Sequence, residues 1–158
     1  MIRIRWPIVA ALAALAALCG CSGGITEPTA AAPADGLLVT VEVGGECVFT
    51  CDPPSGGVTR ALVTLENSSD STVFVAACQN FPLLTEEQLV RGKWTTVGPA
   101  VTCVQGPPSF AVAAHASFRM NSFFAGGTRR LVARVSTSQS LTESRSSASA
   151  SFEVPPTP

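Results

Sequence analysis

The sequence is poor in the side chains that carry most enzyme chemistry. It has one histidine, His115, and one lysine, Lys93, and only 13% of its residues are charged. A Ser-His-Asp group would have to be assembled around His115, and no Gly-x-Ser-x-Gly elbow is present to aim a serine at it. Lys93 has no serine three residues before it, as a local Ser-Lys pair would need. A non-enzymatic role is therefore the expectation.

The sequence also gives little support for binding of a cofactor, a metal or nucleic acid. The chain has no glycine-rich loop that could cradle a phosphate. Besides Met1 it has one methionine, Met120, which together with a single histidine is too little for a copper site. Two of the 10 basic residues, Arg3 and Arg5, lie in the first five positions, and the other 8 stand against 11 acidic residues, a net charge of −3. This balance leaves no basic footprint for nucleic acid, and we expect no cofactor.

What is present begins with an export leader. A short positive segment, residues 1–5, precedes an apolar run of about 13 residues at positions 6–18, which is the usual length of a signal-peptide core. The run is shorter than the roughly 18 apolar residues that indicate a membrane span, and no later stretch approaches that length. The leader therefore predicts export and not a transmembrane helix.

The leader closes on Leu18-Cys19-Gly20-Cys21, which resembles the bacterial lipobox. The resemblance covers the leader alone and implies that residues 1–20 are a cleaved signal peptide and that Cys21 is lipidated and becomes the mature N-terminus. Cys19 departs from the usual Ala or Ser, but modification at Cys19 would put bulky Leu18 at the cleavage position. The alternative is a soluble-secretion signal in which Cys21 is an ordinary cysteine.

A lipid on Cys21 would tether the protein to a membrane of the cell envelope. Ser22, and not Asp, follows the cysteine, which resembles the default for outer-membrane sorting in cells that have that membrane. Residues 21–36 are rich in Gly, Ala, Pro and Thr and predict a lipid-anchored flexible linker with a typical span of about 20 Å. The domain is then expected close to the membrane surface.

Residues 37–154 predict one all-β domain, with residues 155–158 as a C-terminal tail. Leu37, Val39, Val41 and Val43 alternate with mostly polar residues, as half-buried strands do, and the pattern returns at residues 61–65, 73–77 and 131–135. Turn signals separate these strands, which favours an antiparallel β-sandwich. Residues 136–151, rich in Ser, Thr and Ala, are interpreted as a mobile loop before a last strand at residues 149–154.

Residues 85–97 allow two interpretations. A capping box at residues 85–88 and the later Gly92 would fit a short helix. A hairpin that turns at Gly92 explains Trp94-Thr95-Thr96-Val97 better, and it is favoured. Trp94 is then expected as a core anchor against the facing sheet, in preference to a ligand-stacking residue.

Strand spacing, the Asn67–Asp70 turn, the Trp after a Gly turn and a hairpin from Phe110 to Phe118 resemble the small immunoglobulin-like modules of bacterial envelope proteins. The resemblance implies an immunoglobulin-like antiparallel β-sandwich. A fainter resemblance over residues 60–136 is to the proteinase-inhibitor domain first described in bacilli, and it carries no inhibitory residue with it.

Four cysteines remain beyond Cys21, and an even number in an exported domain indicates two disulfides. Three pairings are possible. We favour Cys78–Cys103, because Cys78 ends a predicted strand and Cys103 begins another, which leaves Cys47–Cys51 as a local loop. A four-thiolate zinc site is disfavoured because Cys78 and Cys103 lie far apart in an oxidising compartment. A thioredoxin-type motif is disfavoured because three residues, and not two, separate Cys47 and Cys51.

Charged residues offer little more. Arg130 and Arg134 share a strand face with Arg129 on the other, and a solvated or aggregation-guarding face is favoured over contact with an acidic partner or lipid headgroups. Glu86 and Glu87 would face opposite sides of a strand, which does not suit paired acid–base work.

The main hypothesis is thus a lipid-anchored, non-catalytic β-sandwich with a binding or structural role, whose expected partner is another envelope component. The first alternative is a protease-inhibitor-like binding module that uses the Cys47–Cys51 loop or Pro107-Pro108. The second is a hydrolase with a cryptic site at His115, which in the main hypothesis is an exposed turn residue.

Overall fold

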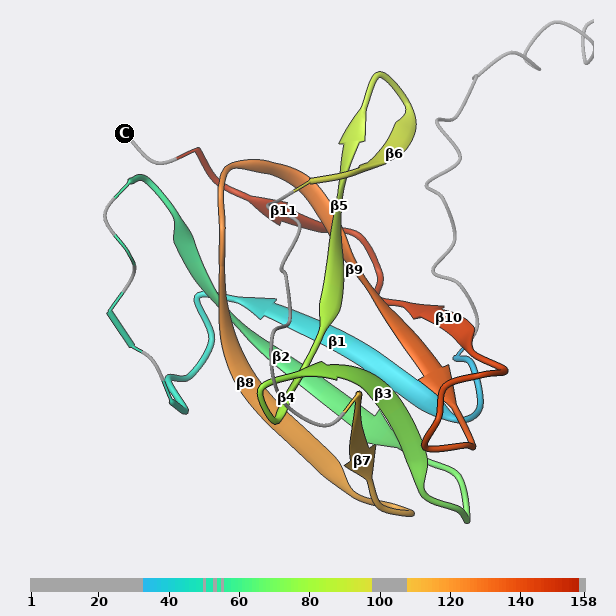
Figure 1. Cartoon of the computed structure of the whole chain (residues 1–158). Helices are drawn as coiled ribbons and strands as arrows, with labels where there is room; N and C mark the ends of the chain where they lie inside the picture. The colour runs from blue at the N-terminus through green and yellow to red at the C-terminus, as the bar shows by residue number, and fades with distance from the viewer. Residues whose placement is uncertain (1–32, 50, 53, 55, 98–107, 157–158) are drawn as a thin grey trace, which may run out of the picture.

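The computed structural model describes residues 33–49, 51–52, 54, 56–97 and 108–156, and within these ranges the chain forms strands and turns but no helix (Figure 1). The described part accordingly contains no helix of the length and apolarity that crossing a membrane requires. The strands are β1 (Leu37–Val43), β2 (Thr59–Asn67), β3 (Val73–Cys78), β4 (Phe81–Pro82), β5 (Leu84–Val90), β6 (Lys93–Thr96), β7 (Ser109–Val112), β8 (Ser117–Phe124), β9 (Gly127–Ser136), β10 (Arg145–Ala148) and β11 (Phe152–Val154).

The first sheet has the order β1-β2-β8, with all pairs antiparallel. Leu37 and Val39 on β1 are buried and Val41 and Val43 are half-buried, whereas the alternate residues Leu38, Thr40 and Glu42 are exposed. This alternation confirms the strand predicted from residues 37–43. It arises because one face of the sheet packs on the core and the other meets solvent or loops.

The second sheet is built around β9. Along one edge of β9, β3 pairs with its last residues and β5 with the rest, so these two strands lie end to end. Strands β10 and β11 share the opposite edge of β9 in the same way. Beyond β3 and β5 lie β7 and β6, and β4 pairs with the end of β3. Within the described residues the second sheet therefore has four strand positions, three of them occupied by broken strands.

The two sheets make an antiparallel β-sandwich with an immunoglobulin-like strand order. Strand positions one, two and five (β1, β2 and β8) form one sheet, and positions three, six and seven (β3 with β5, β9, and β10 with β11) are consecutive in the other. In the constant-type immunoglobulin domain position four lies beside position five. Here position four, made of β6 and β7, lies beside position three instead.

The core lies between the two sheets and is mainly aliphatic. Burial of one Val, Leu or Phe side chain contributes about 1.5–3 kcal/mol to stability. Strands β2, β3 and β9 supply most of the buried residues. The buried cluster comprises Leu37, Val39, Ala61, Val63, Leu65, Val73, Val75, Val112, Phe124, Leu131, Ala133, Val135 and Val154.

The structure corrects the interpretation of residues 136–151 as a mobile loop. Residues 145–148 form β10, which pairs with β9, and Ser147 and Ser149 are buried. Ser147 Oγ donates a hydrogen bond of 2.7 Å to Leu37 O on β1, and Ser149 Oγ accepts one from Leu131 N. These hydroxyls find partners inside the fold, so the strand forms without the apolar alternation that the prediction required. The predicted final strand is present as β11.

The predicted hairpin from Phe110 to Phe118 is also wrong in its pairing. The turn exists, but β7 pairs with β3 in one sheet and β8 with β2 in the other. A short turn between two strands looks the same in sequence whether the strands pair or cross between sheets. Asn67 of β2 stabilises the point where the chain crosses from one sheet to the other, because its Nδ2 donates to both Val112 O and Ala113 O, each at 3.0 Å.

Residues 85–97 form the favoured hairpin, β5–β6, and the helix alternative is wrong. Arg91 and Gly92 both have positive φ, 51° and 77°, as expected of a two-residue type I′ turn. Trp94, however, is not a core anchor. It lies on the outer face of the second sheet, where the Arg130 guanidinium carbon is 4.5 Å from its ring centroid. This half-buried ring packs beneath an arginine of β9.

Candidate functional site

The most distinctive surface feature is the loop closed by the disulfide between Cys47 and Cys51, which we call the stapled loop. The chain leaves β1 through Gly44 and Gly45 and passes over the outer face of β2. At Gly45 a Cβ atom would lie 2.8 Å from Leu62 Cβ, so the close approach requires glycine. Leu62, which points away from the core, is only 4% exposed as a result.

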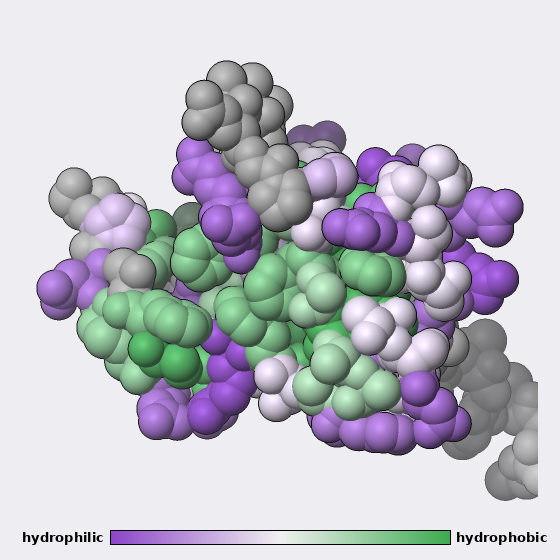
Figure 2. Space-filling model, turned by 60° about the horizontal axis from the view of Figure 1, so that its bottom comes forward, coloured by the Kyte–Doolittle hydropathy of each residue, from purple (hydrophilic) through white to green (hydrophobic). Residues whose placement is uncertain are grey.

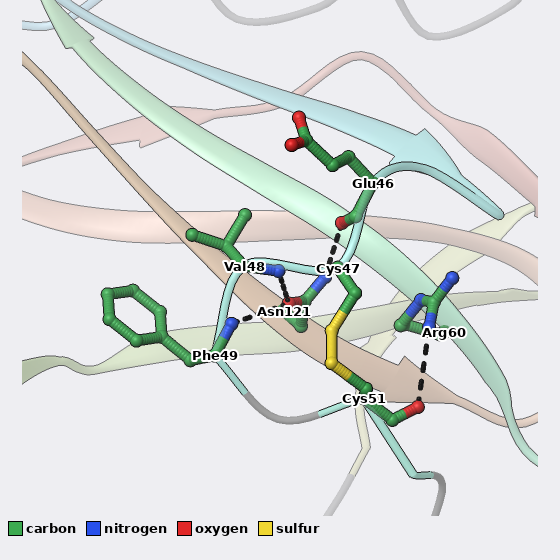
Figure 3. The surroundings of a disulfide bond; sticks show 7 residues. All are labelled: Glu46, Cys47, Val48, Phe49, Cys51, Arg60 and Asn121. Carbon is green, nitrogen blue, oxygen red and sulfur yellow. Dashed lines mark hydrogen bonds between the residues drawn. A yellow bond between two sulfur atoms is a disulfide. The ribbon is translucent and has the colours of Figure 1, made fainter.

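The stapled loop is held on β8 mainly by one amide side chain, that of Asn121 (Figure 3). Asn121 Oδ1 accepts hydrogen bonds from Val48 N at 2.6 Å and Phe49 N at 3.2 Å. Asn121 Nδ2 donates to Glu46 O at 2.9 Å. One side chain therefore satisfies three backbone groups of the loop. Sequence reasoning missed Asn121, since nothing in its neighbourhood marks it as a partner of residues some 75 positions earlier.

Two arginines add outer contacts to the stapled loop. Arg119 Nη2 lies 2.8 Å from Glu46 Oε2, and Arg60 Nη1 donates to Cys51 O at 3.3 Å. Both contacts are solvent-exposed, so each stabilises weakly. Together with Asn121 they attach both ends of the loop to the first sheet.

The stapled loop projects Phe49 into a group of four rings, Phe49, Phe81, Phe110 and Phe118, which we call the aromatic cluster. Phe49 stacks on Phe118 with ring centroids 6.2 Å apart and meets Phe81 edge to face at 6.4 Å. Phe110 lies behind Phe118 at 4.6 Å. Phe49 is 60% exposed and Phe81 52%, so two rings of the cluster face solvent.

Hydrophobic side chains gather on the face that Figure 2 shows, with hydrophilic ones around them. Val48, beside Phe49 in the stapled loop, adds a further exposed apolar side chain at 38%. Contiguous apolar surface of this kind marks contact sites more often than scattered exposed residues do. Sequence reasoning singled out the loop between the cysteines but not the cluster, because Phe49, Phe81 and Phe118 come from separate segments.

A cavity of about 270 Å³ opens between β8 and the β4–β5 corner. Six of its nine lining residues are apolar, among them Pro82, Leu84, Met120 and Phe124, and Glu86 contributes a carboxylate. Pro82 follows Phe81 of the aromatic cluster directly in β4. The cavity and the cluster therefore lie on neighbouring parts of the same strands.

The predicted cysteine chemistry is partly visible. Cys47–Cys51 forms the local loop expected for that pair. Cys78, at the end of β3, is disulfide-bonded, but Cys103 lies outside the described residues, so the pairing Cys78–Cys103 stays a prediction. Cys21 and Cys19 also lie outside the described residues, and lipidation at Cys21 stays a prediction as well.

His115 lies in the exposed turn where it was expected, with a φ of 54°. Its Nε2 is 2.9 Å from Asp70 Oδ1 in the turn after β2, a contact that the sequence did not predict. The side chains are 63% and 100% exposed, so water screens the pair and no enclosed site surrounds it. Pro107 lies outside the described residues, and Pro108 is an exposed residue whose carbonyl accepts from Ala77 N.

Arg130 and Arg134 share the outer face of β9 and Arg129 lies on the other, as predicted. Of the three only Arg134 is exposed, because Arg129 and Arg130 are paired with carboxylates. Arg129 is buried and paired with Glu86, and its Nε donates to Ala125 O at 2.7 Å. Arg130 Nε lies 2.6 Å from Glu87 Oε2 on the outer face. Glu86 and Glu87 do face opposite sides of β5, as predicted, and each meets an arginine of β9. The register between β5 and β9, which the sequence does not show, brings these charges together.

Replacing Glu86 with glutamine is expected to lower the free energy of unfolding by about 3 kcal/mol, because it leaves a buried guanidinium without a counter-charge. The Arg129 side chain is 7% exposed in this pair. The matched control is Glu46→Gln in the exposed pair with Arg119, which should cost under about 1 kcal/mol. Urea denaturation of both variants measures the difference, and equal losses would contradict the assignment of Arg129 as a buried charge.

Within the described ranges, no group of three or more His, Cys, Asp or Glu side chains is arranged to hold a metal ion.

Comparison with known proteins adds little to these observations. No family model matches the chain, and no curated protein matches it. Among solved structures, the X-ray structure of Northeast Structural Genomics Consortium target SoR45 aligns with 76% of this chain and 86% of its own, at 13% identity and a TM-score of 0.46.

Proposed function

We propose that the chain is a lipid-anchored, non-catalytic binding module of the bacterial cell envelope, and that it presents the stapled loop and aromatic cluster to another envelope protein. The observation that carries the binding role is the exposure of Phe49 and Phe81 in one aromatic cluster. The backbone of Phe49 is held by Asn121 and by the disulfide. The leader, residues 1–20, and the Cys21 that follows it support the anchor.

Rigid aromatic side chains suit protein recognition. Phe has few rotatable bonds and a large apolar area, so little conformational entropy is lost when a partner covers it. Asn121 and the disulfide hold the Phe49 backbone, which reduces the ordering cost further. A surface of this kind is expected to supply one or two dominant anchors in an interface.

The linker and the stapled loop join opposite ends of β1. The chain enters β1 at Leu37 and reaches the stapled loop after Val43, at the opposite end of the strand (Figure 1). Seven residues of β-strand span about 20 Å. A linker that holds the domain at Leu37 therefore leaves Gly44, where the chain turns into the stapled loop, at the end of β1 farther from the anchor.

The stapled loop also favours the alternative of a protease-inhibitor-like module, because inhibitors use protruding loops held in one conformation. The two functions differ in what they do to an enzyme. The full mature chain, tested against serine, cysteine, aspartic and metalloproteases, is expected to inhibit none of them. Inhibition that Phe49→Ser abolishes would replace the envelope-partner proposal with the inhibitor one.

The proposal is tested by cross-linking in living cells. A photo-reactive phenylalanine derivative in place of Val48 is expected to capture a specific envelope protein. Addition of Phe49→Ser should lower the yield by about tenfold or more, since an aromatic anchor contributes about 2 kcal/mol or more to an interface. The control is the same probe in place of Ser140, an exposed residue in the turn before β10.

A defined adduct from position 48, reduced by Phe49→Ser and missing at position 140, is the supporting result. Equal capture from both positions, or capture that ignores Phe49→Ser, would show that the aromatic cluster is not the contact surface.

A further inference from the structure

The contacts that hold the stapled loop have one covalent member and several weak ones. The hydrogen bonds from Val48 N and Phe49 N to Asn121 are both exposed to water, as is the ion pair between Glu46 and Arg119. Exposed contacts of this kind contribute little individually. Water can replace each of these hydrogen bonds and the ion pair, but it cannot replace the disulfide between Cys47 and Cys51.

The disulfide also explains how two consecutive N–H groups reach one oxygen. Val48 and Phe49 lie inside the ring that Cys47 and Cys51 close, and both donate to Asn121 Oδ1 (Figure 3). A tight ring excludes most of the backbone conformations in which these two groups diverge. Opening the ring restores those conformations and lowers the population that contacts Asn121.

The position of Phe49 depends on the same ring. Its ring stacks on Phe118 of β8 and meets Phe81 of β4, and no other described part of the stapled loop contacts those two rings through an aromatic side chain. Loss of the fixed loop backbone therefore removes Phe49 from the aromatic cluster, while Phe110 and Phe118 stay packed against the core.

The disulfide is accessible. Cys51 is exposed and Cys47 is half-buried, so a thiolate can approach the sulfur of Cys51. The ring that this disulfide closes is short, and short rings stabilise a disulfide less through chain entropy than long ones do. Exposed disulfides with little such stabilisation are the ones that dithiol reductants reduce first.

We propose that the Cys47–Cys51 disulfide is a redox-sensitive clasp, which presents Phe49 when oxidised and releases it when a dithiol protein of the envelope reduces it. As a means of controlling partner binding, the clasp rests on the proposed function. As a structural device it does not, since the loop responds to reduction whether or not a partner exists.

The chemistry is ordinary thiol–disulfide exchange. A thiolate of the reductant attacks Sγ of Cys51, the S–S bond breaks, and Cys47 leaves as a thiolate that takes up a proton. The second thiol of the reductant then attacks the mixed disulfide and releases Cys51. The chain gains two thiols, and the reductant, which supplies two electrons, becomes a disulfide.

The first test uses hydrogen exchange on the full mature chain. In the double variant Cys47→Ser/Cys51→Ser, the amides of Val48 and Phe49 are expected to exchange about 30-fold faster than in the wild type, as the loop-entropy estimate for so short a ring predicts. The amide of Leu141, which donates to Ser138 O in the exposed turn before β10, exchanges by local opening and should keep its wild-type rate. Unchanged exchange at Val48 and Phe49 would overturn the clasp.

A second test covers the case in which the double variant fails to fold. The wild-type chain is equilibrated in dithiol redox buffers of graded potential, and free thiols are alkylated and identified by mass spectrometry. Cys47 and Cys51 are expected to be alkylated at potentials where Cys78 is still disulfide-bonded, with faster exchange at Val48 in the same samples. Reduction of Cys78 first, or reduction of Cys47 and Cys51 without faster exchange, would overturn the proposal.

These outcomes are separate from those of the binding proposal. If position 48 captures no protein while the disulfide is oxidised, the proposed partner is wrong, and the clasp is still decided by the exchange and alkylation tests. Capture that is present in oxidised cells and lost after reduction would support both the partner and the clasp.

Discussion

Replacement of Asn67 with alanine is expected to lower the free energy of unfolding by about 3–5 kcal/mol, because the variant removes the hydrogen bonds of one buried and two partly buried carbonyl groups. Asn67 is fully buried at the end of β2. Its Nδ2 donates to Ser71 O, Val112 O and Ala113 O at 2.8–3.0 Å, and its Oδ1 accepts from Ser69 N and Ser69 Oγ. The side chain thus joins the turn after β2 to the crossing between β7 and β8.

The matched control is Asn121→Ala. Asn121 also joins three backbone groups, but it does so beneath an exposed loop where water can replace it. We expect a loss of about 1 kcal/mol or less from this variant. Urea denaturation of both proteins measures the contrast. Similar losses from the two variants would show that burial does not determine how much each amide side chain contributes to the free energy of unfolding.

The Cys21→Ser variant is expected to move the protein from the membrane fraction to the soluble fraction. Each buried methylene of an acyl chain contributes about 0.8 kcal/mol to membrane binding, so two or more chains anchor the protein almost permanently and their loss is close to all-or-none. Detergent phase partitioning of the wild type and the variant measures this change.

The control for that variant is Cys19→Ser. In the proposed assignment Cys19 belongs to the cleaved leader, and serine suits its position, so this variant should stay with the membrane. A Cys19→Ser protein that became soluble, together with a Cys21→Ser protein that stayed bound, would move the modification site to Cys19.

The sequence predicted much of the fold because sandwich strands carry a clear signal. Strands β1, β2, β3 and β9 have one face on the core and one toward solvent, loops or outer contacts, so their apolar residues recur every second position. The β5–β6 hairpin was predictable from a glycine turn. In each case local sequence and tertiary structure require the same residues.

The sequence failed where polar residues are satisfied by distant partners. Ser147 on β10 is buried because its hydroxyl reaches Leu37 O, 110 positions earlier. Arg129 is buried because the register of β5 on β9 brings Glu86 to it. Neither hydrophobic periodicity nor composition reports such pairings, since both depend on which strands become neighbours.

The candidate site was predictable only in part, for the same reason. The spacing of Cys47 and Cys51 indicated a local loop, and the structure contains it. The aromatic cluster needs Phe49, Phe81 and Phe118 from three different segments, and Asn121 needs the loop to cross β2 onto β8. These residues share no sequence pattern, and the sandwich alone brings them together.

The most direct test of the account is the mass of the N-terminal peptide of the protein isolated from the envelope of its own cells. The account predicts a peptide that begins at Cys21 and carries the added mass of a diacylglyceryl group. A peptide that begins at another residue, or an unacylated Cys21 in protein recovered from the culture medium, would contradict the anchored role proposed for this domain.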